Sequence, residues 1–491
     1  MLKLKKITWV YLFSTIFILL NAYFLIKEQY VFTLLPIVLL IIFTAIFALD
    51  KLIYLILFLA PISLPLFEFY PSLSFSFSIP TEPLLFGILI IFILKLLMDK
   101  SFDRRILTHP VSLLIYINLF WMLITSTTST MPVVSFKYFV ARLWFLASFY
   151  FLATQLFKNK NNIHKYFWFY IISLIIVIGY TINRHLAYGL FDQEAANFVC
   201  NPFFADHTSY GAVLAMLIPL LIGTLFLKIS VLKKLIVWIV LSIYIVAIVL
   251  SFTRAAWVSL IAAMFVFVIM IFKIKFRLVF VVLTTITTLF FVYRTDIIIY
   301  LQSNHQDSST NIAKHIESIS NISSDASNME RLNRWSSAYR MFKEKPFLGW
   351  GPGTYMFKYA PFQLSYEKTI ISTNAGDKGN AHSEYLGPLA ESGILGMLSI
   401  LALVIYLMYI GIRNYTNATN REIKILSLVI TLGLFTYLIH GIMNDFLDMD
   451  KASALFWGYA AVLVAIDIYH INDKKKQKEE LPENNKKQEL E

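Results

Sequence analysis

The chain has 491 residues, of which 58% are hydrophobic and only 15% are charged, and its mean hydropathy is +0.68. A soluble domain carries roughly 25% charged residues, so this composition excludes an ordinary soluble protein. The net charge of +12 does not require nucleic acid, because most basic residues lie in short loops between apolar blocks, where anionic lipid headgroups can neutralise them.

The apolar residues form blocks of about 17–22 residues, the length at which a helix crosses a hydrocarbon core of ~30 Å. Backbone groups in lipid must be paired within the segment, so each block is expected to be a helix. The sequence predicts an all-α polytopic membrane protein with 12–14 transmembrane helices, the range reflecting two pairs of blocks with very short turns. The fourteen candidate spans are 7–26, 30–49, 52–70, 82–98, 108–125, 136–157, 165–182, 208–227, 233–252, 255–272, 278–293, 394–411, 425–443 and 452–470.

Basic residues mark one side of the membrane. Lysines precede the first span, and alternating from there, Lys and Arg gather in every second loop and in the C-terminal tail. This positive-inside pattern predicts that both termini are cytoplasmic and that the first block is retained as a span. An odd number of spans would break the pattern.

The predicted outer face carries two long segments. The first, 183–207, contains Cys200, a lone thiol that we expect to be structural. The second, 294–393, is one large periplasmic loop of about 100 residues. Its first third is polar, and an amphipathic helix is predicted from Met329 to the residue before Pro346, with Leu332, Trp335, Tyr339 and Phe342 on one face. Such a helix can turn its aromatic residues toward lipid and its arginines toward headgroups.

These segments divide the chain into four parts. Residues 1–293 hold the first eleven spans, 294–393 form the loop, 394–470 hold the last three spans, and 471–491 form a charged cytoplasmic tail. We find no internal repeat, which counts weakly against a secondary transporter.

Arginines on the outer face are scarce, so each is a candidate ligand for an anion. Arg254 lies at the outer tip of a predicted hairpin, although an arginine there could also snorkel at the boundary. Arg331 and Arg334 lie on the amphipathic helix, where Arg334 could simply pair with Glu330. Arg142 lies inside a span near its outer end, and could serve either a ligand or helix pairing. Guanidinium groups bind phosphate oxygens in a bidentate manner, so together these residues would suit a lipid-linked diphosphate.

His382 is the candidate catalytic base, because a neutral imidazole can accept a proton from an attacking hydroxyl. The alternative is a histidine that caps the following helix. Glu384 and Glu391 could orient the ring or lie on the helix surface. His207, beside Asp206, is a weaker candidate. The spacing of Cys, His and carboxylates predicts no metal site.

The segment that contains His382 also carries a resemblance. His382 and Ser383 are followed by nine residues, Gly393, two residues and Gly396, which fits the pattern H-[NSQ]-x9-G-x-x-[GTY] of the O-antigen ligase and polymerase superfamily. That family's Arg-x3-Leu element reads Arg254 to Val258 here, with Val in place of Leu. Its helix leading into a Pro-φ-φ-Gly-x-Gly turn resembles RLNRWSSAYRMFKEKPFLGWG.

The resemblance implies a fold and an activity. It implies a GT-C-like bundle whose large loop covers a lateral cavity open to lipid, in the bacterial inner membrane with the active site facing the periplasm. The donor would be an undecaprenyl-diphosphate-linked glycan and the acceptor a hydroxyl of a glycolipid, glycan or protein, with no metal or other cofactor and no nucleic acid. His382 would activate the acceptor, Arg254 with Arg331, Arg334 or Arg142 would engage the diphosphate, and His207, Ser383 and Glu384 would support acceptor binding.

The acceptor stays open at this point. A ligase attaches finished glycan to a lipid A core, a polymerase extends a growing chain, and an O-oligosaccharyltransferase modifies protein Ser or Thr; the pattern fits a ligase slightly better. A non-enzymatic polysaccharide exporter is a further alternative. An exporter would place polar residues in mid-span, whereas the spans here are largely apolar.

Overall fold

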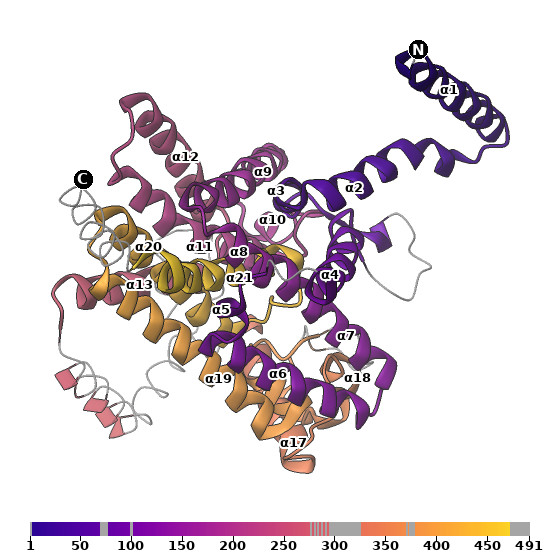
Figure 1. Ribbon diagram of the computed structural model, residues 1–491. Helices are drawn as coiled ribbons and strands as arrows, with labels where there is room; N and C mark the ends of the chain where they lie inside the picture. The colour runs from indigo at the N-terminus through magenta and orange to yellow at the C-terminus, as the bar shows by residue number, and fades with distance from the viewer. Residues whose placement is uncertain are drawn as a thin grey trace, which may run out of the picture. The chain divides into compact units, whose positions relative to one another are not determined.

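The computed structural model describes residues 2–68, 77–98, 102–274, 326–369, 372 and 379–471, with single residues or pairs between 277 and 293. This described part is almost entirely helical (Figure 1). Its only strands are β1 (Leu64–Pro65) and β2 (Ser78–Ile79), which pair antiparallel with Leu64 opposite Ile79. The all-α membrane fold predicted from composition is confirmed.

The α-helices in chain order are α1 (Leu2–Ile26), α2 (Leu35–Phe47), α3 (Leu49–Leu59), α4 (Thr81–Met98), α5 (Arg104–Leu107), α6 (Pro110–Thr127), α7 (Pro132–Phe145), α8 (Ala153–Leu156), α9 (Lys160–Leu186), α10 (Gln193–Ala196), α11 (His207–Leu225), α12 (Val231–Leu250), α13 (Arg254–Ile271), α17 (Ala326–Glu344), α18 (Tyr355–Lys358), α19 (Leu386–Asn417), α20 (Arg421–Met443) and α21 (Asp450–Ala465). Leu146–Leu152 and Ile466–His470 are π-helical, and short 3-10 turns occupy Tyr30–Leu34, Leu66–Glu68, Ala360–Phe362 and Ser365–Glu367.

Eleven helices in the described residues are long and apolar enough to cross a membrane. Two predicted spans are wrong: block 30–49 contains the 13-residue α2, and block 52–70 contains most of the 11-residue α3 and then a strand. A break at Ala48, where the backbone leaves the helical region, keeps α2 and α3 from forming one long helix. The predicted span 278–293 and the predicted polar segment 294–325 lie largely or wholly outside the described residues.

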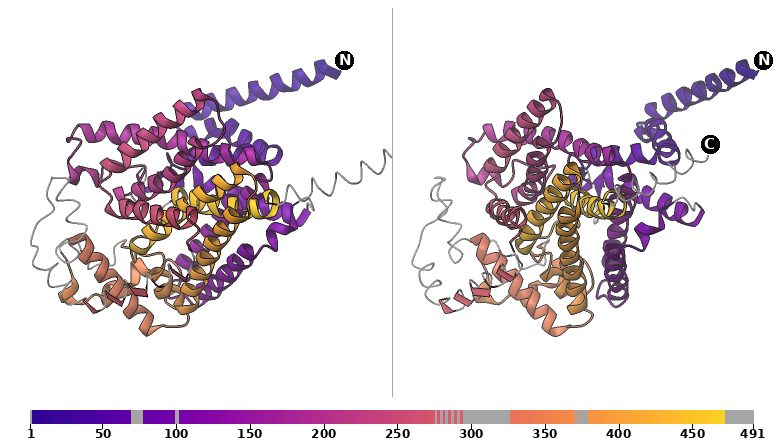
Figure 2. Two further views of the ribbon diagram at one scale, coloured as in Figure 1. Left: turned by 90° about the vertical axis from the view of Figure 1, so that its left-hand side faces the viewer. Right: turned by 60° about the vertical axis from the view of Figure 1, so that its left-hand side comes forward.

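The contacts between residues divide the chain into two compact units, 1–55 and 56–491. In the first unit, Phe32 packs on Phe17 and Phe24 of α1 with ring centroids 5.5 and 5.0 Å apart. In the second unit, α20 packs against α11, α13 and α19, and α21 is buried along its whole length (Figure 2). All the residues of the candidate site belong to this second unit.

A break inside α19 joins this helix to the loop that precedes it. Gly393 has φ 70° and ψ −169°, a conformation essentially restricted to glycine. The break leaves the carbonyls of Ala390 and Glu391 without helical donors, and they accept hydrogen bonds from the backbone N–H groups of Trp350 (3.1 Å) and Gly351 (2.7 Å). The Ile394 N–H in turn donates to the Pro346 carbonyl (3.0 Å). The glycine-rich turn after α17 is therefore bonded to the broken segment of α19.

Helix α17 leaves part of the predicted apolar face exposed, since Leu332 and Tyr339 are 39% and 51% exposed. Its residues with less than 5% exposure include Asn333, Arg334, Ser337, Ala338 and Met341. Ala338 and Met341 belong to a buried cluster that includes Ala390 of α19. The expectation that the arginines of this helix point toward headgroups is therefore wrong for Arg334.

Candidate active site

His382 lies in a tight loop between the glycine-rich turn and α19. Its backbone has φ 48°, which is uncommon for a residue other than glycine. The Asn380 Oδ1 accepts a hydrogen bond from the His382 N–H (3.2 Å), and the Trp335 indole of α17 donates to the His382 carbonyl (3.1 Å). These bonds hold the strained backbone, and strain of this kind is typical of functional sites.

Two neighbours of His382 anchor the loop. The Ser383 hydroxyl accepts from the N–H groups of Tyr385 and Leu386, both at 3.3 Å, so it caps α19. Glu384 accepts from the N–H groups of Phe446 (2.7 Å) and Leu447 (2.9 Å) and from the Tyr437 hydroxyl. Ser383 and Glu384 are thus committed to positioning the loop, and Glu384 ties it to the connection between α20 and α21.

Arg334 is buried and paired with a neighbouring carboxylate, although its Nη1 has no hydrogen-bond partner among the described residues. Its Nε donates to Glu330 Oε1 at 2.6 Å, and its guanidinium stacks 3.9 Å from the ring centroid of Tyr359. The group also packs so closely on Gly379 that a Cβ there would overlap it. The structure therefore contains the alternative in which Arg334 pairs with Glu330. Arg331, one residue earlier, is only partly buried.

The N-termini of α11 and α13 contact one another. Asp206 caps α11 by accepting from the Ser209 N–H at 2.7 Å, and His207 is the first residue of that helix. The Thr253 hydroxyl donates to the His207 carbonyl at 2.7 Å. Arg254 follows Thr253 directly and begins α13. Asp206 is also one of the charged groups that act electrostatically on His382. One hydrogen bond therefore joins the segment of Arg254 to that of His207, and the neighbouring Asp206 acts on His382 through its charge.

The surroundings of His382 favour its neutral form. Burial, together with the positive charges of Arg331 and Arg334, lowers the pKa of His382 to about 4. Asp206 opposes this effect; burial would raise its own pKa, but hydrogen bonds from Ser209 and Thr208 outweigh burial and lower it. At neutral pH the imidazole can therefore accept a proton, with cationic groups close by.

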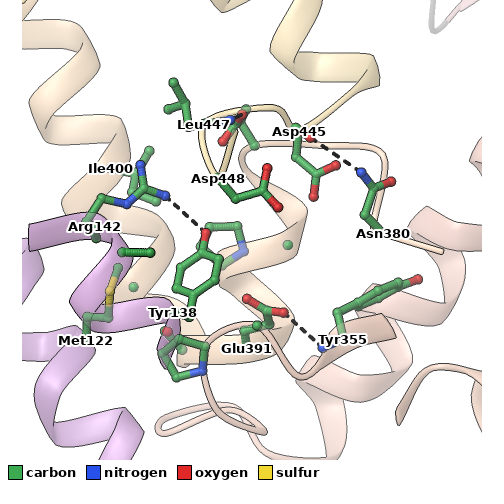
Figure 3. A pocket seen from close by; sticks show the side chains of 18 of the residues that line it. Met122, Tyr138, Arg142, Tyr355, Asn380, Glu391, Ile400, Asp445, Leu447 and Asp448 are labelled. Carbon is green, nitrogen blue, oxygen red and sulfur yellow. Dashed lines mark hydrogen bonds between the residues drawn. The ribbon is translucent and has the colours of Figure 1, made fainter. Parts of the chain in front are cut away.

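A cavity of about 770 Å³ lies on the other side of the His382 loop. Asn380, Ala381 and Glu384 line it, but His382 does not. Arg142 lies in this cavity, 8% exposed, and donates to the Tyr138 hydroxyl at 3.0 Å (Figure 3). Five carboxylates also line the cavity: Glu82, Glu384, Glu391, Asp445 and Asp448. Glu391 accepts from the Tyr355 N–H at 2.9 Å and so does not orient His382.

The structure therefore separates the predicted residues into two groups. His382, Arg331 and Arg334 share one neighbourhood, and Asp206, His207 and Arg254 adjoin it. Arg142 lies apart from them among carboxylates.

Sequence reasoning missed His440, which is 1% exposed at the end of α20 and is subject to the charges of Arg331 and Asp206. It also missed Asp445 and Asp448. A polar residue within an apolar span was the available signal for His440.

The comparisons with known proteins agree with the motifs. Residues 239–401 match the family model described as O-Antigen ligase. The match includes Arg254, Arg331, Arg334 and His382, and it confirms the predicted resemblance. A comparison with curated proteins found no significant match.

Proposed function

We propose, on the premise that residues 239–401 match the O-antigen ligase family, that this protein transfers a glycan from a membrane-anchored diphosphate to an acceptor hydroxyl. The family match supports membrane glycosyl transfer in O-antigen or polysaccharide biosynthesis. Our proposal adds that the donor is an undecaprenyl-diphosphate-linked glycan on the periplasmic face. It also adds that the acceptor is a glycolipid core, as in a ligase.

The proposed step is a displacement at the anomeric carbon. The acceptor hydroxyl gives its proton to the His382 imidazole as its oxygen forms a bond to the anomeric carbon. The bond from that carbon to the diphosphate oxygen breaks, and the diphosphate leaves with the electron pair. Arg331 and Arg254 would stabilise the charge that develops on the leaving group, since preorganised cations act most strongly where charge builds up. Arg334 would contribute to the local positive potential while it remains paired with Glu330.

The observation that carries this proposal is His382 on a strained, well-anchored loop. The charges of Arg331 and Arg334 also disfavour its protonated form. A polysaccharide exporter would have no need for a base held in this way. Arg142 is left out of the proposed diphosphate site, because the carboxylates around it do not favour an anionic ligand. A polymerase or a protein O-oligosaccharyltransferase would use the same donor chemistry, so the acceptor is the point that requires a direct test.

The test is a transfer assay with purified protein and lipid-linked glycan. The acceptors, supplied separately, are a lipid A core, a lipid-linked repeat unit and a Ser/Thr peptide, and a ligase should glycosylate only the first. His382→Ala should lower transfer by about 10²–10⁴-fold, the usual contribution of a general base, and Arg254→Ala should also abolish most of it. Glu194→Gln, an exposed site in α10, serves as the control. Full activity of both active-site variants would exclude the mechanism.

A further inference from the structure

The acidic cavity beside the His382 loop has no role in the proposed step. Its lining includes Asn380 and residues of the connection between α20 and α21, which we call the polar end, and also Ile400, Leu403 and Val404 of α19, which are apolar. Its volume of about 770 Å³ lies within the range of pockets that hold small ligands, ~300–1,000 Å³. A cavity of this size next to a reactive loop suggests a second binding site.

The lining of the cavity disfavours a further negative charge. It holds five carboxyl groups, which outnumber the two cationic side chains, Lys137 and Arg142. Burial and the charge of Glu384 raise the pKa of Asp448 to about 6, and burial with the charges of Asp448 and Glu384 raises the pKa of Asp445 well above its usual range. The repulsion that hinders ionisation of these side chains would also hinder entry of a phosphate or carboxylate.

The polar end contains hydrogen-bond acceptors, and one of them has no donor in the parts of the chain that the structure describes. Figure 3 shows the carboxylates of Asp445 and Asp448 and the Tyr138 hydroxyl turned toward the same space. The Asp445 Oδ1 is buried and has no hydrogen-bond partner in the described part of the chain. A buried acceptor without a donor is costly, and a ligand hydroxyl or amine would supply the missing donor.

Aromatic side chains form much of the remaining wall. The lining includes Trp121, Trp144, Trp457, Tyr355 and Tyr385. The Trp121 indole is held in place by donating to the Ser392 carbonyl at 2.8 Å. Flat apolar faces beside carboxylate and amide groups suit a molecule that has both C–H faces and many hydroxyls, as a sugar ring does.

We propose that the polar end of this cavity binds a sugar unit that carries no acidic group. The inference rests on the proposed glycan transfer, since the sugar would belong to one of the two substrates, and it adds the charge class of that substrate. The 380–384 segment then separates an acidic sugar site from the cationic surroundings of His382. Opposite charges on its two sides would direct the diphosphate to one compartment and the neutral or amino-bearing sugar to the other.

The test measures binding of three trisaccharides of different charge to the purified protein in lipid nanodiscs, by calorimetry and without donor lipid. The probes are chitotriose, its N-deacetylated cationic form, and trigalacturonate. The two non-acidic trimers should bind in the millimolar range or better, and the acidic one on the order of tenfold more weakly or not at all. If neither non-acidic trimer binds, or if trigalacturonate binds equally well, the inference is overturned.

Substitutions of Asp445 and Asp448 test whether these two residues cause the preference against the acidic sugar. Asp445→Asn combined with Asp448→Asn keeps the side-chain volumes but removes two ionisable carboxyl groups, so the preference against trigalacturonate should shrink by about tenfold. Should the double variant fail to fold, Asp448→Asn alone, in the cavity wall, should show a smaller change in the same direction. Glu194→Gln is the matched control with unchanged preference. A preserved preference in the folded Asp variants would also overturn the inference.

This experiment separates the two proposals. Sugar binding without any glycan transfer in the separate assay would leave the cavity assignment standing and remove the proposed function. Transfer that depends on His382, without charge-selective sugar binding, would support the proposed function and overturn the cavity assignment.

Discussion

At the scale of single residues, the site depends on one histidine and the charges near it. His382 has a pKa of about 4 because burial and two arginines disfavour the imidazolium. Such a low value keeps the base unprotonated but also makes it weak. An anionic donor bound beside the arginines would neutralise them and raise the pKa of His382, which would strengthen the base when substrate is present.

This reasoning predicts two different pH profiles. The rate constant kcat/KM reports the free enzyme, so its His382-dependent decrease should occur near pH 4. The value of kcat reports the complex, in which the pKa is raised, so it should begin to fall at a higher pH. Steady-state kinetics across the acid range test this. If kcat/KM decreased at a higher pH than kcat, the prediction that donor binding raises the pKa of His382 would be wrong.

Arg331 and Arg334 are predicted to behave differently on substitution. Arg334→Met would leave Glu330 buried without its cation, and breaking such a pair costs about 3–5 kcal/mol, so the melting temperature should fall markedly. Arg331→Ala changes a partly exposed side chain and should reduce transfer with a much smaller loss of stability. Thermal denaturation of both variants, alongside the transfer assay, distinguishes a structural arginine from a binding one. Equal melting temperatures would show that the Arg334–Glu330 pair is not structural.

At the scale of elements, the glycines of the family motif have a structural explanation. A Cβ at Gly393 would overlap the carbonyl of Phe347, and at Gly396 it would overlap the Ser392 side chain. The break at Gly393 turns two helix carbonyls toward the glycine-rich turn. The spacing from His382 to the glycines therefore sets how the loop and α19 meet.

Gly393→Ala should destabilise the protein, because its backbone conformation costs a non-glycine residue about 1–3 kcal/mol and the Phe347 carbonyl would have to move. Transfer should fall with it, since Trp350 and Gly351 would lose their acceptors in α19. Gly179→Ala is the control: this glycine lies in α9 with open space beside it, so the change should stabilise by about 0.5–1 kcal/mol. Similar melting temperatures for the two variants would refute the role assigned to the break.

At the scale of the whole molecule, the number of spans determines the orientation. Fourteen spans were predicted from apolar blocks, and two of these blocks form helices too short to cross. Removing these two spans from the predicted fourteen leaves an even number of spans, so the prediction that both termini are cytoplasmic is unaffected. The blocks were miscounted because apolar composition alone does not reveal a break such as that at Ala48.

Cysteine labelling tests the predicted orientation. A membrane-impermeant thiol reagent applied to intact spheroplasts should label Glu194→Cys, in the predicted outer segment, and should not label Thr419→Cys, between α19 and α20. Native Cys200 should not be labelled, because burial and the charge of Asp206 raise its pKa to about 12. Labelling of Thr419→Cys in intact spheroplasts would reverse the assigned topology.

The sequence by itself determined the membrane class, most of the spans, and the resemblance to the O-antigen ligase family through the spacing of His382, Gly393 and Gly396. These features are local: hydrophobic length and short motifs depend only on residues near one another in the chain. The tertiary structure decided that Arg334 is buried with Glu330, that Glu384 anchors a loop, and that Arg142 faces Asp448 across an acidic cavity. Such pairings join residues up to about three hundred positions apart, and they depend on which helices pack together, because charge acts through distance in space and not along the chain.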